Sequence, residues 1–204
     1  DLVLTNSGDG FRNIYSASIA KSYEWGGDWS FGYAHTDSED ARSMTSSVAF
    51  SNFENAARYD IVNMPLDRSD YVVPHRFSFN VNYELELFEN FPTKFSLGGY
   101  AQQGLPYSYT MSGTAFEPYT NAISRTLASN DVLSDYRGQI APRNIANDDW
   151  IARVDFKLSQ AIPGISEGHK AEGFVVIQNL GNLLSPNWGI VREHGFPALA
   201  SLYT

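Results

Sequence analysis

The stretch His75–Leu87, HRFSFNVNYELEL, alternates apolar and polar side chains without interruption. Successive side chains of a β-strand point to opposite faces of a sheet, so this stretch predicts a strand with one apolar and one polar face. Its apolar side chains are Phe77, Phe79, Val81, Tyr83, Leu85 and Leu87, and its polar ones are Arg76, Ser78, Asn80, Asn82, Glu84 and Glu86. The pattern is typical of transmembrane β-barrels, in which one face meets lipid and the other meets water, and also of half-buried soluble sheets.

Six segments share this alternation, and short turns join them into three predicted hairpins: 11–23 with 29–35, 75–88 with 94–109, and 150–162 with 170–179. The first turn contains Gly26 and Gly27, which permit positive φ. The second turn, residues 89–93, contains Pro92, and the third covers residues 163–169. The segments therefore predict an all-β, antiparallel chain.

Two long polar segments, 36–74 and 110–149, separate the hairpins and are rich in Ser, Asn, Asp and Ala. Long structureless loops count against a compact soluble domain. Outer-membrane barrels, in contrast, have short turns on one side and long loops on the other. The sequence therefore predicts an antiparallel transmembrane β-barrel segment of about six to seven strands with long extracellular loops. No helix is required, although Ser46–Arg58 could form one or two helical turns.

The composition narrows the function classes. The chain has 204 residues, 14% of them aromatic, no cysteine and a formal charge of −9. No apolar run approaches the roughly 20 residues of a membrane-spanning helix. The mean hydropathy of −0.30 does not exclude a barrel, because alternation hides the hydrophobicity of its strands. The acidic balance disfavours nucleic acid as a partner.

No catalytic or cofactor-binding pattern stands out. The sequence has no nucleophile elbow, no phosphate-cradling glycine loop and no thiol. The four histidines are scattered over loops and strand ends and match no metal-site spacing: His35, His75, His169 and His194. The acidic tract 37–40 lacks the pattern of a calcium loop and suits a solvated extracellular loop. We therefore expect no enzyme activity, no cofactor and no metal site.

Both ends have features of an internal piece of a longer protein. Asp1 is not a start methionine, and no signal peptide follows it. Ala198–Thr204 predicts the beginning of another strand, and Thr204 is not the aromatic residue with which outer-membrane barrels usually finish. We therefore expect the strand at Phe11 and the strand at 198–204 to pair with strands outside this sequence.

Six segments together resemble the C-terminal barrel of TonB-dependent outer-membrane transporters, specifically the Oar-like group. They are LTNSGDGFRNIYSASIAKSY (4–23), VVPHRFSFNVNYELE (72–86), FSLGGYAQQGLPYSYT (95–110), YRGQIAPRN (136–144), DDWIARVDFKLSQAIP (148–163) and HKAEGFVVIQNLGNLLSPNWG (169–189). The resemblance implies a large barrel in the outer membrane of a Gram-negative bacterium, of which this chain would be part of the C-terminal region. It also implies a plug domain and a TonB-contacting segment, neither within residues 1–204, and uptake of a substrate that the sequence does not name.

In such a barrel the polar faces would line the lumen. The lumen-facing candidates are Arg76, Asn80, Asn82, Glu84, Arg153, Asp155 and Lys157. They could form a wall along which substrate or plug passes, or they could simply pair with one another and with water. Gly98, Gly99 and Gly104 interrupt one predicted strand and mark either curvature or close approach of another segment.

The tryptophans fall near strand ends and turns. Trp25, Trp29 and Trp150 are candidates for the aromatic belts at a membrane interface, with substrate stacking as the alternative. Trp188 lies beyond a predicted strand end and suits a loop.

Two other function classes stay open. One is an outer-membrane barrel with a structural, adhesion or secretion-linked role. The other is a soluble β-sandwich or lectin-like binding module, which would dissolve without detergent because it buries its apolar faces. A plug domain and a TonB-contacting segment upstream would favour import.

Overall fold

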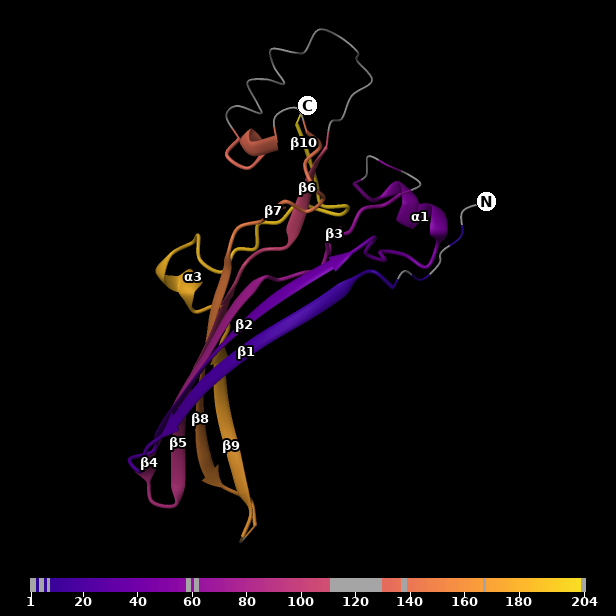
Figure 1. Ribbon diagram of the computed structural model, residues 1–204. Helices are drawn as coiled ribbons and strands as arrows, with labels where there is room; N and C mark the ends of the chain where they lie inside the picture. Colours follow the sequence, from indigo (N-terminus) through magenta and orange to yellow (C-terminus); the bar gives the residue numbers. More distant parts are fainter. Residues whose placement is uncertain are drawn as a thin grey trace.

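The computed structural model describes residues 3, 6, 8–57, 60, 63–110, 130–136, 139–166 and 168–202. Most of these residues belong to one long, twisted antiparallel sheet, with a smaller irregular layer at one end of it (Figure 1). The chain is therefore all-β with short helical pieces, as its alternation predicts.

The main sheet is a meander in the order β1-β2-β4-β5-β8-β9, with the short β3 pairing with β2. Its strands are β1 (Phe11–Ser22), β2 (Gly27–Asp40), β3 (Asp67–Arg68), β4 (His75–Phe88), β5 (Phe91–Gln102), β8 (Ile151–Pro163) and β9 (Lys170–Ile177). The three predicted hairpins are confirmed as the antiparallel pairs β1–β2, β4–β5 and β8–β9.

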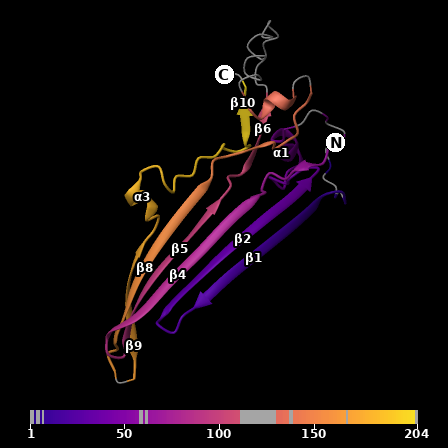
Figure 2. The same cartoon turned by 60° about the vertical axis from the view of Figure 1, so that its left-hand side comes forward.

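The short turns lie together at one end of the sheet, which we call the turn end (Figure 1, Figure 2). In the first turn, Tyr23 N donates to Gly27 O at 2.8 Å, and Gly26 has a φ of +89°, which favours glycine. The second turn consists of Glu89 and Asn90, with Asn90 at a φ of 65°. Pro92, expected in this turn, lies inside β5 instead.

The opposite end of the sheet, which we call the loop end, carries the irregular layer (Figure 2). Helix α1 (Ala49–Glu54) lies within the predicted Ser46–Arg58 segment, although Arg58 itself is outside the described residues. The layer also holds the short η1 (Leu133–Tyr136) and a second, three-stranded sheet. Its order is β10 (Leu199–Ser201), β6 (Pro106–Thr110) and β7 (Ala146–Asn147). The predicted loop 110–149 is described only in part, because residues 111–129 and 137–138 lie outside the described residues.

Two predicted strands are wrong in detail. The segment 94–109 is not one strand, because β5 ends at Gln102 and β6 (Pro106–Thr110) pairs with β7 (Ala146–Asn147) instead. Gly104 lies at the break, where an added Cβ would meet Asp148 at 2.6 Å. The chain turns here because glycine admits this approach and Asp148 N bonds to Leu105 O.

The predicted strand at 198–204 does form, as β10 (Leu199–Ser201), but it does not extend the main sheet. It pairs in parallel with β6, with Ala200 opposite Tyr109. Its partner therefore lies within this chain, contrary to the expectation of a missing neighbour. Thr204 is outside the described residues. A further short helix, α3 (Gly181–Leu184), follows β9 beside β8 and was not expected.

The register confirms the two-faced strand at residues 75–87. Residues that oppose each other in an antiparallel pair project from the same face. One row across four strands consists of Phe31, Phe79, Gly99 and Val154, and the next row consists of Ser30, Asn80, Gly98 and Asp155. We call the face of Phe79 the apolar face and the face of Asn80 the polar face.

The main sheet is a single layer with almost no core of its own. Buried hydrophobic side chains in the described part of the chain are Val72, Leu133, Ala146 and Ile151, and only Ile151 belongs to the main sheet. On the apolar face Phe31 is 44% exposed and Val81 46% exposed. Because a sheet with an apolar face must bury it against something, this face requires a cover that the described residues do not supply.

Candidate functional site

The polar face gathers all seven residues that the sequence nominated as lumen-facing. In register, Asn82 opposes Ser96, which opposes Lys157, and Tyr100 opposes Arg153. The seven on this face are Arg76, Asn80, Asn82 and Glu84 of β4 and Arg153, Asp155 and Lys157 of β8. These seven residues therefore share one surface, although their strands come from different hairpins.

Opposite charges on the polar face pair across and along strands. Lys94 Nζ lies 3.0 Å from Glu84 Oε2, and Lys157 Nζ lies 3.3 Å from Glu172 Oε1. These side chains are about half exposed, so water screens each pair and neither contributes much to the stability of the fold.

Toward the loop end, the polar face carries two arginines on either side of one tyrosine. The Arg76 guanidinium lies 4.6 Å from the centre of the Tyr100 ring and donates a hydrogen bond to Gln102. Arg153 opposes Tyr100 on the other side and donates from Nε to Asp155 Oδ1 at 2.8 Å. These contacts hold both guanidinium groups against the sheet.

The glycines of β5 make room for side chains of β4. A Cβ added at Gly98 would lie 2.6 Å from Asn80 Oδ1. One added at Gly99 would lie 2.6 Å from the Arg153 carbonyl oxygen of β8 and 2.8 Å from the Phe79 ring. The close approach that the glycines indicate is therefore made by the two neighbouring strands of the sheet.

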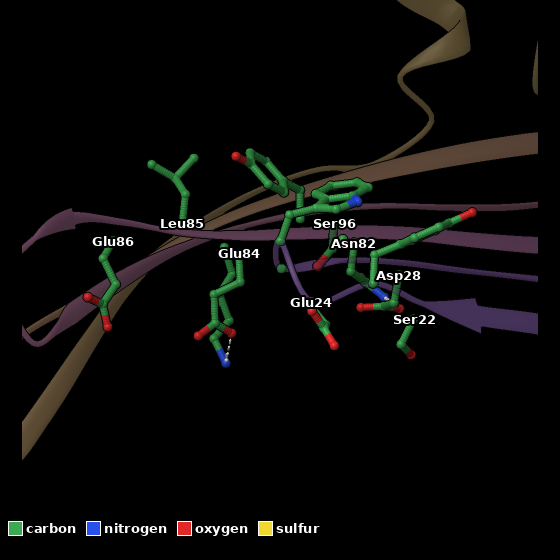
Figure 3. Close-up of a pocket in the computed structure, with 14 residues that line it drawn as sticks. Ser22, Glu24, Asp28, Asn82, Glu84, Leu85, Glu86 and Ser96 are labelled. Atoms are coloured by element: carbon green, nitrogen blue, oxygen red, sulfur yellow. Dashed lines mark hydrogen bonds and ion pairs between the residues drawn. The ribbon is translucent and has the colours of Figure 1, made fainter.

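A cavity of about 640 Å³ lies at the turn end, between the first turn and β4. Figure 3 shows Leu85 on one side of the strand, while Glu84 and Glu86 project to the other. Asn82 Nδ2 donates to Asp28 Oδ1 at 2.8 Å in the same wall. The polar lining is mainly acidic: Glu24, Asp28, Glu84 and Glu86, with Lys94 as the cation. This surface favours cationic groups.

Aromatic rings on the apolar face collect near the two ends of the sheet. The turn-end group is linked by Tyr23–Trp25 and Trp25–Tyr83, with ring centroids 5.2 and 5.6 Å apart. Trp29 joins this group, because its Nε1 donates to Tyr23 Oη at 3.3 Å.

The loop-end group is built around Phe77, whose ring lies 4.9 Å from Tyr33 and 6.0 Å from Trp150. Along β4, the six residue steps from Phe77 to Tyr83 separate the two groups by about 20 Å at ~3.3 Å per residue. Trp25, Trp29 and Trp150, which the sequence nominated as interface aromatics, thus lie in two separate groups.

Two histidines that appeared scattered in the sequence meet at this end. His35 opposes His75 in the β2–β4 register, and their ring centroids are 4.9 Å apart. They help to line a cavity of about 290 Å³ whose polar wall also includes Asp37, Arg68, Gln103 and Asn147. The alternation alone could not reveal this pair, because the two histidines meet only in the β2–β4 register. The 34 residues that connect β2 to β4 do not specify that register.

A buried polar network fastens the two long segments together, and sequence reasoning missed it. Arg143 is 7% exposed, and its Nη2 donates to Asp40 O and Asp40 Oδ1, each at 2.7 Å. Asn144 Nδ2 donates to Arg68 O at 2.7 Å and to Asp70 Oδ1 at 2.6 Å. The motif YRGQIAPRN contains Arg143 and Asn144, but loops have no periodicity that would place their partners.

Another contact ties the C-terminal segment to the small sheet. The His194 ring stacks on Tyr107 with centroids 4.0 Å apart, and His194 Nδ1 lies 2.6 Å from Asp148 Oδ1. Burial and then the hydrogen bond with Tyr109 raise the pKa of Tyr107, so its hydroxyl stays protonated. The stack and the hydrogen bond hold the C-terminal segment against β6.

The part of the chain that the structure describes contains no group of three or more His, Cys, Asp or Glu placed to hold a metal ion. None of its described helices is long and apolar enough to cross a membrane. Comparisons with protein-family models, with curated proteins and with solved structures found no match.

Proposed function

We propose that this chain forms part of the wall of a transmembrane β-barrel in a bacterial outer membrane, with its apolar face toward lipid and its polar face toward the lumen. The observation that carries the proposal is a single-layer antiparallel sheet with an uncovered apolar face. Lipid would supply the missing cover, and the aqueous lumen would solvate the polar face.

The dimensions suit a membrane. A transmembrane β-strand needs about 9–11 residues. The strands β1 and β5 have 12 residues, β8 has 13, and β2 and β4 have 14 each. The two aromatic groups bound an apolar band of about 20 Å along the strand, close to the ~25 Å band of outer-membrane barrels. Trp25, Trp29 and Trp150 would then belong to the two interfacial belts.

The sheet edges support a larger closed structure. Among the described residues, β1 and β9 are the edges of the main sheet and pair on one side only. An open sheet edge is not tolerated in lipid, so further strands must complete the wall. We propose that these belong to the same barrel and that a plug domain occupies its lumen.

Within this class we propose TonB-dependent uptake of a substrate across the outer membrane. The support is the resemblance of six segments to the Oar-like group of transporters, and the energised step would use a TonB-contacting segment outside residues 1–204. A barrel with a structural, adhesion or secretion-linked role would have the same wall. Only a transport measurement therefore distinguishes such a role from TonB-dependent uptake. A soluble sandwich is disfavoured because the described residues provide no second layer over the apolar face.

The chain contains no cysteine, so single introduced cysteines can report which face meets water. Phe79→Cys and Asn80→Cys are consecutive on β4 and make a matched pair. In the complete protein in outer membranes, a charged maleimide should label Asn80→Cys, whereas Phe79→Cys should react only with a lipid-soluble maleimide. Equal labelling of the two positions by the charged reagent would refute the membrane assignment.

Uptake is tested separately. Cells carrying the complete protein should lose the growth or uptake phenotype that it confers when TonB is deleted. If the labelling pattern holds but every phenotype survives without TonB, the structural or secretion-linked role is correct instead.

A further inference from the structure

The positive charge of Arg76 on the polar face is not compensated by a carboxylate of the described residues. Strands β4, β5 and β8 carry four lysines and arginines on this face: Arg76, Lys94, Arg153 and Lys157. Lys94, Arg153 and Lys157 each lie within 3.3 Å of a carboxylate oxygen. Arg76, in contrast, forms no ion pair within the described part of the chain, so its charge is left for another partner.

The Arg76 guanidinium is held in place by neutral groups. It lies 4.6 Å from the centre of the Tyr100 ring, and its Nη1 donates to Gln102 Oε1. Its Nε and Nη2 donate to no acceptor that the structure describes. These two nitrogens form an edge from which a guanidinium can donate two parallel hydrogen bonds to one carboxylate. The neighbours of Arg76 therefore orient it and leave a bidentate edge unused.

The polar face is open beside this guanidinium. Arg76 is exposed, and the residues of β2 that oppose Arg76 and Ser78 are Ala34 and Gly32. Neither of these has a side chain large enough to cover a guanidinium. In the proposed barrel, Arg76 would thus meet the water of the lumen near the loop end. Low-dielectric walls focus the field of such a charge into the aqueous space and raise the local concentration of ions of opposite sign.

We propose that Arg76 binds a carboxylate group of the substrate on its way into the lumen, an inference that deepens the proposed uptake function and rests on it. The carboxylate would accept from Nε and Nη2, and charge-assisted bonds of this kind are stronger than neutral ones. Arg153, on the other side of Tyr100, is already paired with Asp155 at 2.8 Å. A second free charge for a dianion such as phosphate is therefore missing beside Arg76, and a monoanion fits better.

Two serines of the polar face lie in opposite surroundings and can report the local potential. Ser22 opposes Asp28 and lines the acidic cavity at the turn end (Figure 3). Ser78 opposes Tyr100 and lies two positions from Arg76 on the same face. Cysteines at these serines therefore sample the acidic turn end and the proposed carboxylate site with the same substitution.

The test uses the complete protein in outer membranes, without native cysteines, at about 0.1 M salt, where charges are screened over about 10 Å. Ser78→Cys and Ser22→Cys are each labelled with an anionic methanethiosulfonate that carries a sulfonate and with a cationic one that carries a trimethylammonium group. The ratio of the anionic to the cationic labelling rate should be at least about threefold higher at Ser78→Cys, because a unit charge several Å away acts with roughly RT in water.

Variants of Arg76 assign this ratio to its charge. Arg76→Gln should remove the excess at Ser78→Cys, whereas Arg76→Lys should keep it, because lysine retains the charge. Lys94→Gln is the matched control: it removes a cation of the same face that is paired with Glu84 toward the turn end, and should leave the ratio at Ser78→Cys unchanged. The comparison of the two serines needs no change at Arg76, so it stands even if an Arg76 variant fails to fold.

Binding of the carboxylate is measured by protection. Benzoate, its neutral isostere benzamide and inorganic phosphate, at equal concentrations, compete with the anionic reagent at Ser78→Cys. Benzoate should slow the labelling in a saturable manner and more than the other two probes do. Arg76→Lys should weaken this protection although it retains the charge, because an ammonium group lacks the bidentate edge.

Equal labelling ratios at the two serines, or a ratio at Ser78→Cys that does not change with Arg76→Gln, would overturn the proposal. Protection by benzamide equal to that by benzoate would contradict the role of the charge. Stronger protection by phosphate than by benzoate would show that the site does not select a carboxylate.

The two proposals can fail separately. If the Phe79→Cys and Asn80→Cys labelling shows no difference, the membrane placement is wrong. If that labelling holds while the labelling of Ser78→Cys ignores Arg76, only the carboxylate site is wrong.

Discussion

Arg143 and Asp40 lie 103 positions apart in the sequence, yet Arg143 Nη2 donates to both the carbonyl and the carboxylate of Asp40 at 2.7 Å. The contact joins the end of β2 to the segment before β7. The described parts of the two long segments are therefore joined to each other at the loop end of the sheet.

Arg143→Ala should loosen this layer. Removing one partner of a buried ion pair costs about 3–5 kcal/mol, and because the Asp40 side chain keeps 27% exposure we expect about 2 kcal/mol. The measurement is limited proteolysis of the complete protein, in which cleavage between β2 and β4 should accelerate. Arg192→Ala is the control, since Arg192 lies 4.0 Å from Asp149 and both side chains are exposed. Similar cleavage of both variants would mean that the buried pair does not fasten the layer.

Val81→Arg and Asn82→Arg test the assignment of the two faces. An arginine near the bilayer midplane on a lipid-facing position costs about 2–4 kcal/mol, whereas a lumen position tolerates it. Val81→Arg should therefore impair folding into bilayers far more than Asn82→Arg, as measured by urea unfolding of the complete protein in vesicles. Equal penalties, or the reverse order, would show that the faces are assigned wrongly.

Gly26→Ala should destabilise the first hairpin more than Gly168→Ala destabilises the third. Both glycines have positive φ, +89° and +81°, which costs an L-residue about 1–2 kcal/mol. At Gly26 the added Cβ would also lie 2.3 Å from the backbone carbonyl oxygen of Glu84, whereas nothing lies within 4 Å at Gly168. Unfolding free energies of the two variants give the comparison. A larger loss for Gly168→Ala would contradict this packing of the first turn against β4.

The sequence predicted the main sheet because its strands obey a single local rule. The alternation at residues 75–87 assigns Phe79 and Asn80 to opposite faces without any knowledge of neighbouring strands. Gly26-Gly27 and the other short turns then indicate the three hairpin pairs, β1–β2, β4–β5 and β8–β9. The same rule placed all seven polar-face candidates on one surface.

The loop end could not be predicted in this way, because its contacts depend on long-range pairing. The parallel pairing of β10 with β6 joins Ala200 to Tyr109, and no local pattern specifies such a partner. His35 and His75 approach each other only through the β2–β4 register. The buried network of Arg143 lies in segments without hydrophobic periodicity. It is therefore found from the burial of the Arg143 side chain in the structure and not from a sequence pattern.

Depth-dependent fluorescence quenching should place the two aromatic groups at opposite boundaries of the apolar band. In single-tryptophan versions of the complete protein, Trp25 and Trp150 should be quenched more strongly by lipids brominated near the headgroup than by lipids brominated near the acyl-chain ends. The reason is that interfacial aromatic side chains lie at the headgroup level, about 20 Å apart along β4 in this sheet. Phe79→Trp is the matched control, because Phe79 lies between the groups on the same face and should show the opposite preference. If all three tryptophans respond alike to both lipids, the apolar face does not span a bilayer in this orientation. If Trp25 and Trp150 are quenched deeply while Phe79→Trp is quenched near the surface, the band lies elsewhere on the sheet.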